Sequence, residues 1–216
     1  MYRLALLLVF CAVVRAEEIP LSLSRLDLRH VRAETVTYRD LPALKLTGDS
    51  ADTGETMAII KGLVFRDGTI NLDVAGVPSQ TAEAQARGFI GVAFRASGGA
   101  ARFENIYIRP TNGRADDQLR RNHSVQYESV PDFPWFRLRK ESPGVYETYT
   151  DLAVGEWTHL RLEVHGTSVE LYVNRTAQPC LIVHDLKLGD SAGGIGLWIG
   201  PGTEGYFREL TVTPKP

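Results

Sequence analysis

The chain has 216 residues, of which 44% are hydrophobic, 23% charged and 9% aromatic. This composition is typical of a globular protein and excludes a disordered, collagen-like or coiled-coil chain. The formal net charge of −2 argues against a general binder of nucleic acid or of anionic membranes.

The first 16 residues have the pattern of a secretory signal. Arg3 precedes an apolar run from Leu4 to Val14, and the segment ends in the small residue Ala16. The run is too short to span a membrane. We therefore expect cleavage after Ala16, a secreted or periplasmic protein, and no membrane span in the mature chain. Loss of Arg3 and Arg15 reduces the basic residues from 24 to 22 against 26 acidic ones, a net charge of −4.

Cleavage would also remove Cys11 and leave Cys180 as the one cysteine of the mature chain, which excludes an internal disulfide. Cys180 begins the apolar run 180–183. We therefore expect it to be a buried small hydrophobic residue and not a reactive thiol.

Period-two alternation dominates the chain and predicts strands with one buried and one exposed face. It is clearest in residues 69–74, 159–165 and 169–174. Further strands are expected at 35–38, 43–47, 57–61, 88–96, 102–110, 123–129, 135–139, 144–149, 180–185, 194–200 and 205–212. Residues 75–87 and 110–122 are long polar connections, and residues 17–34 fit either a short helix or a first strand. This pattern predicts an all-β fold for residues 17–216, an antiparallel jelly-roll sandwich of two packed sheets.

Three motifs of the C-terminal third follow one another in a distinctive order. They are Gly155-Glu156-Trp157 before a strand, Leu171-Tyr172-Val173-Asn174, and Gly194-Ile195-Gly196-Leu197-Trp198-Ile199-Gly200. In this order they resemble the concanavalin A-like lectin/glucanase superfamily, including its laminin-G-like jelly rolls. Trp157 and Trp198 are both expected to pack in the core.

Residues 88–95 and 103–110 resemble the central hairpin of secreted bacterial domains similar to 3-keto-disaccharide hydrolases. That resemblance implies a hydrolase or lyase acting on a glycoside. The family-16 glycosidase signature Glu-x-Asp-x-(x)-Glu does not occur in the sequence, which disfavours a retaining glucanase of that type.

Successive side chains of a strand point to opposite faces of the sheet, a rule that we call strand parity. It predicts one sheet face rich in groups that bind sugars. Because Ile90, Val92 and Phe94 must face the core, Arg95 is expected on the opposite face, and the same rule applies to the three following strands. The expected ligand-binding residues are Arg95, Asn105, Tyr107, Arg109, Gln126, Trp135 and Arg137. Aromatic rings stack on the apolar face of a pyranose, and the polar groups bind its hydroxyls. A structural ladder of Arg and Glu on a solvated face is the alternative.

Candidate catalytic residues are few. Glu128 lies on the predicted outward face and His123 at a loop-to-strand junction, whereas parity directs Glu104 toward the core. The five histidines lack metal-ligand spacing, so we expect no metal site and no cofactor, although Asp116 and Asp117 could join backbone carbonyls around a calcium ion.

Residues 87–140 contain ten basic and five acidic side chains, a local charge of +5. This excess fits a uronic or sulfated sugar, and it fits salt bridges between loops equally. We therefore expect a secreted jelly-roll domain that recognises a carbohydrate ligand on this face. The alternatives are a glycoside-acting hydrolase similar to the 3-keto-disaccharide group and a laminin-G-type module whose partner is a protein.

Overall fold

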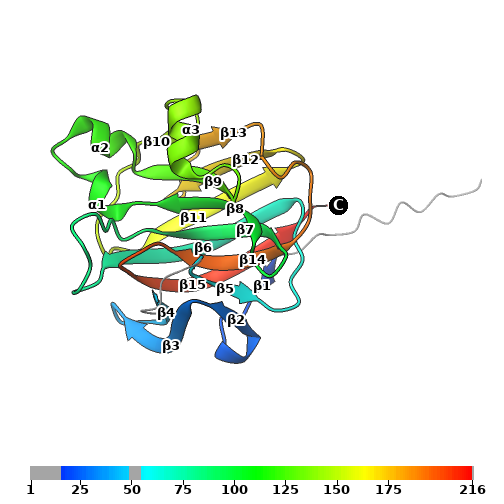
Figure 1. Cartoon of the computed structure of the whole chain (residues 1–216). Coiled ribbons are helices and arrows are strands. Elements are labelled where there is room, and N and C mark those ends of the chain that lie inside the picture. Colours follow the sequence, from blue (N-terminus) through cyan, green and yellow to red (C-terminus); the bar gives the residue numbers. More distant parts are fainter. Residues whose placement is uncertain (1–15, 49–54, 216) are drawn as a thin grey trace, which may run out of the picture.

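Two antiparallel sheets packed face to face make up the fold (Figure 1). The computed structural model describes residues 16–48 and 55–215, so the expected signal segment, with Cys11, lies outside the described residues except for Ala16. In these ranges sheet A has the order β13-β12-β11-β6-β15-β4-β3, with β1 paired to β15, and sheet B has the order β10-β9-β8-β7-β14-β5-β2. This is the two-sheet sandwich that the alternation predicts.

The strands of sheet A are β1 (Glu17–Glu18), β3 (Val31–Tyr38), β4 (Leu41–Gly48), β6 (Gly68–Pro78), β11 (Thr158–His165), β12 (Ser168–Val173), β13 (Leu181–Val183) and β15 (Thr203–Pro214). Those of sheet B are β2 (Leu26–Arg29), β5 (Met57–Ile60), β7 (Ile90–Ser97), β8 (Arg102–Ile108), β9 (Val125–Val130), β10 (Glu147–Thr148) and β14 (Gly194–Ile199). The segment 17–34, which the sequence left open, holds β1, the short 3-10 helix η1 (Leu23–Arg25), β2 and the start of β3.

The core lies between the sheets and contains the residues that alternation assigns to the buried faces. Leu72 of β6 pairs with Leu160 of β11, and both side chains are fully buried. Glu104 also points inward, as parity predicts. Its carboxylate accepts hydrogen bonds from the Tyr127 hydroxyl at 2.8 Å and the Leu188 backbone N–H at 2.7 Å. These bonds satisfy a buried charge that would otherwise be costly in the core.

The prediction of a strand at 135–139 is wrong, because this segment forms the helix α3 (Trp135–Glu141), which packs against β9. Five alternating residues do not distinguish a strand from a short helix with one buried side chain, here Leu138. Arg137 and Glu141 form an ion pair at helical i, i+4 spacing, 2.9 Å apart. The polar connection 110–122 likewise contains the helices α1 (Pro110–Gly113) and α2 (Gln118–Asn122).

Arg95 does not lie on the outer face of sheet B as predicted. The pairing of β7 with β8 shifts between Phe94 and Ser97, and Arg95 has a positive φ of 54°. Such a bulge re-aims the side chain of the extra residue. The buried Arg95 guanidinium donates to the carbonyls of Arg66 (2.9 Å), Gly166 (2.7 Å) and Gly189 (2.6 Å) and to Asp67 Oδ1 (3.1 Å). It therefore ties three connecting segments together and does not meet solvent.

Of the two tryptophans expected to pack in the core, Trp198 does so, in a second buried cluster, whereas Trp157 does not. Trp157 is half-buried on the outer face of sheet A, edge-on to Tyr38 with ring centroids 5.6 Å apart. Trp198 is buried on the outer face of sheet B. Cys180 packs half-buried against the core, and burial raises the pKa of its thiol to about 11.

We expect Arg95→Met to lower the free energy of unfolding by about 3–5 kcal/mol, because three carbonyls lose their donor and the Asp67 carboxylate loses its cationic partner. Urea unfolding would measure the loss. Arg102→Met is the matched control: Arg102 belongs to the same hairpin but is 53% exposed, and its pair with Asp132 should contribute less than about 1 kcal/mol. Equal losses in the two variants would contradict the role given to Arg95.

Candidate functional site

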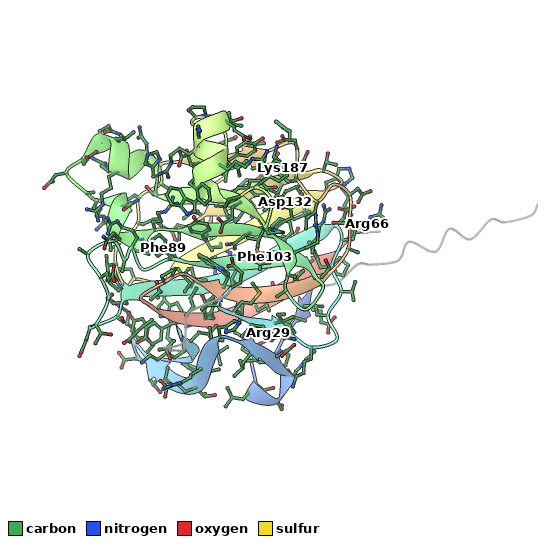
Figure 2. The ribbon with its side chains drawn as sticks, viewed as in Figure 1. Arg29, Arg66, Phe89, Phe103, Asp132 and Lys187 are labelled. Atoms are coloured by element: carbon green, nitrogen blue, oxygen red, sulfur yellow. The ribbon has the colours of Figure 1, made fainter. Side chains whose placement is uncertain are left out.

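Antiparallel pairing in sheet B brings most of the predicted outward residues together on one face. Figure 2 views the sandwich from this side, with Phe89 and Phe103 labelled. One row across the strands consists of Gln126, Tyr107, Gly91 and Trp198, and the next consists of Glu128, Asn105, Ala93 and Gly196. We call these two rows, with Glu55 and Trp135, the sheet B site. The placement of Asn105, Tyr107, Gln126 and Glu128 on this face agrees with strand parity.

The floor of the sheet B site is aromatic. The rings of Trp198 and Tyr107 lie 4.7 Å apart, across a position occupied by Gly91. A Cβ at Gly91 would lie 2.2 Å from the carbonyl oxygen of Ile106, so this position requires glycine. Sequence reasoning missed Trp198 as a site residue, although its alternation with the buried Leu197 gave the signal.

A buried carboxyl group lies at the centre of the site. Glu128 Oε1 accepts from Asn105 Nδ2 at 3.1 Å, and Oε2 accepts from the backbone N–H of Trp135 at 3.2 Å. Burial raises the pKa of Glu128 to about 7, and the negative charge of Glu55 acts in the same direction, while the bond from Asn105 opposes it. The Oδ1 atom of Asn105 is buried with no hydrogen-bond partner. The site therefore combines a carboxyl group that titrates near neutrality with an acceptor that has no partner.

Glu55 supplies a second carboxylate. Its Oε2 atom accepts a hydrogen bond from Trp198 Nε1 at 3.2 Å, which anchors it to the aromatic floor. No sequence pattern singled out Glu55, because it precedes β5 and reaches the site only through the pairing of β5 with β14.

Arg109, Tyr107 and Gln126 satisfy one another beside the carboxyl group. Arg109 donates to the Tyr107 hydroxyl at 2.9 Å and to Gln126 Oε1 at 3.4 Å, and Gln126 Nε2 donates to the Tyr146 carbonyl at 3.1 Å. All three predicted residues are buried. They hold the floor of the site in place, so we assign them a positioning role and not direct ligand contact.

Among the predicted ligand residues that lie in the sheet B site, Trp135 is the one that solvent reaches. Its side chain is 39% exposed at the start of α3, with the guanidinium groups of Arg139 and Arg109 at 4.7 and 5.8 Å from the ring centroid. Two cations near one ring fix its orientation through cation–π attraction. The ring therefore offers an ordered apolar surface next to Glu128.

His123 and Arg137, both predicted site residues, belong to other groups. His123 Nδ1 lies 2.8 Å from Glu147 Oε2, which also accepts from Arg139, and burial lowers the pKa of the imidazole. Arg137 is exposed on α3, where it pairs with Glu141 and donates to the Asp132 carbonyl at 2.6 Å. Of the two catalytic candidates, Glu128 is therefore the one held in the sheet B site.

Asp117 of the suggested calcium position caps α2, its Oδ1 accepting from the backbone N–H of Arg120 at 2.9 Å. Across residues 16–48 and 55–215, no group of three or more His, Cys, Asp or Glu side chains is arranged to hold a metal ion. Within the same ranges no helix is long and apolar enough to cross a membrane.

Comparison with known proteins identifies the fold. No family model matches the sequence, and no curated protein matches it. Among solved structures, a candidate glycosyl hydrolase from Parabacteroides distasonis is 12% identical, with a TM-score of 0.59 over 93% of this chain and 100% of the other. Carbohydrate binding module CBM66 from Bacillus subtilis is 14% identical, with a TM-score of 0.55 over 85% and 95%. Peanut lectin is 6% identical, with a TM-score of 0.51 over 92% and 96%. The chain thus has a lectin-like jelly-roll sandwich fold.

The raised pKa of Glu128 predicts a pH-dependent stability. Its value of about 7 in the folded state exceeds the ordinary 4.5, so the folded protein keeps a proton that the unfolded chain has lost between these pH values. Stability should therefore fall as the pH rises from about 4.5 to 7, by an amount on the order of 3 kcal/mol.

We expect Glu128→Gln, which keeps the shape without the charge, to remove this fall and to be more stable than the parent at pH 8. Urea unfolding at pH 5 and pH 8 would measure both. A variant that is destabilised equally at pH 5 and pH 8 would show that Glu128 is ionised in the folded protein at both pH values.

Proposed function

We propose that this protein binds a carbohydrate through the sheet B site. The observation that carries the proposal is the half-exposed ring of Trp135, whose own backbone N–H binds the buried Glu128–Asn105 pair. A sugar ring stacks its C–H face on an aromatic side chain while its hydroxyls bind nearby carboxyl and amide groups. The unpartnered Asn105 Oδ1 is suited to accept from such a hydroxyl after a small local movement.

The structural neighbours support this choice of ligand. A carbohydrate binding module and a lectin share the sandwich along nearly their whole lengths. Because a fold alone does not fix function, the support comes from the combination of the fold with the aromatic and carboxyl groups of this face. We further propose that the mature chain acts outside the cytoplasm, where its N-terminal segment would direct it.

Trp135→Ala should weaken binding of a glycan identified on an array by tenfold or more, because the stacking surface is lost. The melting temperature should change little, since the ring packs at the surface of α3. Phe136→Ala is the matched control, because Phe136 is the next residue of the same helix and is 61% exposed. Isothermal titration calorimetry on both variants would measure affinity.

The Phe136 ring meets the Trp135 ring edge-on, with centroids 5.8 Å apart. Equal loss of binding in the Phe136→Ala control would therefore point to the packing of α3 instead of a ligand contact by the Trp135 ring. A sharp drop in melting temperature on Trp135→Ala would show that the ring is structural. No binding to any neutral or uronic glycan on the array would contradict carbohydrate recognition and favour a protein partner.

A second candidate function is cleavage of a glycoside, either by hydrolysis or by elimination as in a lyase. Two observations favour it: the pKa of Glu128 is raised to about 7, and Glu55 supplies a second carboxylate in the site. A carboxyl group that is protonated at neutral pH can donate a proton to a leaving glycosidic oxygen. Two carboxylates flanking a glycosidic bond are the usual requirement of such enzymes.

If the protein is an enzyme, Glu128→Gln should reduce turnover of a bound oligosaccharide by about 100-fold or more while affinity stays within a few fold. Release of new reducing ends or unsaturated products would measure turnover. His123→Gln, which alters the other candidate residue, should retain most of the activity. A parent protein that binds but shows no turnover would leave the binding function alone.

A further inference from the structure

A groove of about 600 Å³ crosses the outer face of sheet A, on the opposite side of the sandwich from Glu128. Side chains of β1, β6, β11 and β15 line it, together with Arg175 in the turn after β12. The volume lies within the range of small-molecule sites. The groove is separate from the sheet B site, and none of its residues was singled out as a ligand residue by the sequence.

Internal contacts hold the polar floor of this groove in place. His159 Nδ1 lies 2.7 Å from Asp73 Oδ1, which directs the other ring nitrogen away from that carboxylate. Asn71 Nδ2 donates to Thr211 Oγ1 at 3.3 Å, on the neighbouring strand. These groups still have hydrogen-bonding capacity, because an amide oxygen and a hydroxyl each bind more than one partner.

The charges around the groove are of both signs. Arg161 and Arg175 supply positive charge, and Glu18 and Glu209 supply negative charge. Arg161 is paired with Glu163 and Glu209 with Arg208, so two of these charges are partly neutralised within the protein. The Arg161 guanidinium is fixed over the Tyr172 ring, 3.6 Å from its centroid, which limits its freedom to follow a ligand. A strongly anionic or cationic ligand would meet a like charge here, whereas a neutral ligand with many hydroxyls finds both donors and acceptors.

An aromatic cluster lies on the same face of sheet A. Tyr38 stacks on Tyr206 with centroids 3.7 Å apart and meets Trp157 edge-on. Arg208 links this cluster to the groove, with its guanidinium 5.6 Å from the Trp157 ring centroid and its Nε 3.7 Å from the Asp73 carboxylate. Trp157 Nε1 is buried and has no hydrogen-bond partner. Aromatic rings beside a mixed polar groove are the combination that sugar recognition uses.

We propose that this groove is a second carbohydrate site that takes a short neutral oligosaccharide. Asn71, His159 and Thr211 bind its hydroxyls, and the Trp157 cluster contacts the apolar face of a further sugar unit. The proposal takes its ligand class from the proposed function but does not depend on the sheet B site. A protein with two such sites on opposite faces binds two separate chains of one polysaccharide and gains avidity from it.

The test is the number of oligosaccharides bound per protein, measured by isothermal titration calorimetry with cellotetraose, xylotetraose, laminaritetraose and trigalacturonate as probes. The double variant Asn71→Leu/Thr211→Val removes both partners of a cross-strand hydrogen bond, a change that is nearly neutral for folding. Thr69→Val/Thr213→Val is the matched control, since these residues pair one row further along the same two strands and do not line the groove. Circular dichroism checks folding, and His159→Ala replaces the double variant if that variant does not fold.

We expect two molecules of a neutral probe per parent protein, one per Asn71→Leu/Thr211→Val protein, and one per Trp135→Ala protein. The affinity of the sheet A groove should fall about tenfold or more in its variant and stay unchanged in the control. One molecule per protein, lost only in the sheet A variant, would support the groove and overturn the sheet B site.

One molecule per protein, lost only in Trp135→Ala, would overturn the groove proposal and leave the proposed function standing. Binding of trigalacturonate in the groove in preference to every neutral probe would overturn the neutral ligand class. Failure of every probe to bind would overturn both proposals.

Discussion

The antiparallel pairing of β7, β8 and β9 is the constraint on which the candidate site depends. Register places Ala93, Asn105 and Glu128 side by side, and the small side chain of Ala93 leaves room beside the amide. A slip of one residue in either pairing would turn the polar groups of the slipped strand toward the core. The closely packed inner faces prevent such a slip, because the same strands bury Val92, Ile106 and Tyr127 on the other side.

Burial under α3 gives these polar groups their chemical character. A carboxylate on a solvated sheet face would titrate near its ordinary pKa, whereas Glu128 loses its solvation to the helix that follows its own strand. The same helix supplies the backbone N–H that binds the carboxylate and the ring that faces solvent. Stability and the proposed function therefore oppose each other at Glu128. The ionised carboxylate destabilises the folded state at high pH, and it is also the group that the proposed ligand would contact.

Alternation in the sequence predicted the faces of β8, β9, β6 and β11, because each of these strands has one side in a packed core. It failed at Arg95, where a bulge changes the parity without altering the local composition. It failed again at Trp135, where a helix of seven residues with one buried leucine looks like alternation. Glu55 and the sheet A groove had no sequence signal, because strands far apart in the chain bring their residues together.

The outer faces of the two sheets differ in how far a ligand can reach their polar side chains. This difference distinguishes residues that hold the fold together from residues that can contact a ligand. On sheet B, Arg109 and Gln126 bind each other and nearby carbonyls, so little of their hydrogen-bonding capacity is left for a ligand. On sheet A, by contrast, Arg161, Glu209 and His159 also have partners in the protein but line an open groove. Aromatic residues chosen by sequence as ligand contacts are therefore informative only where the structure leaves them uncovered. By that criterion Trp135 on one face and the groove beside Trp157 on the other are the surfaces that we propose for sugar binding.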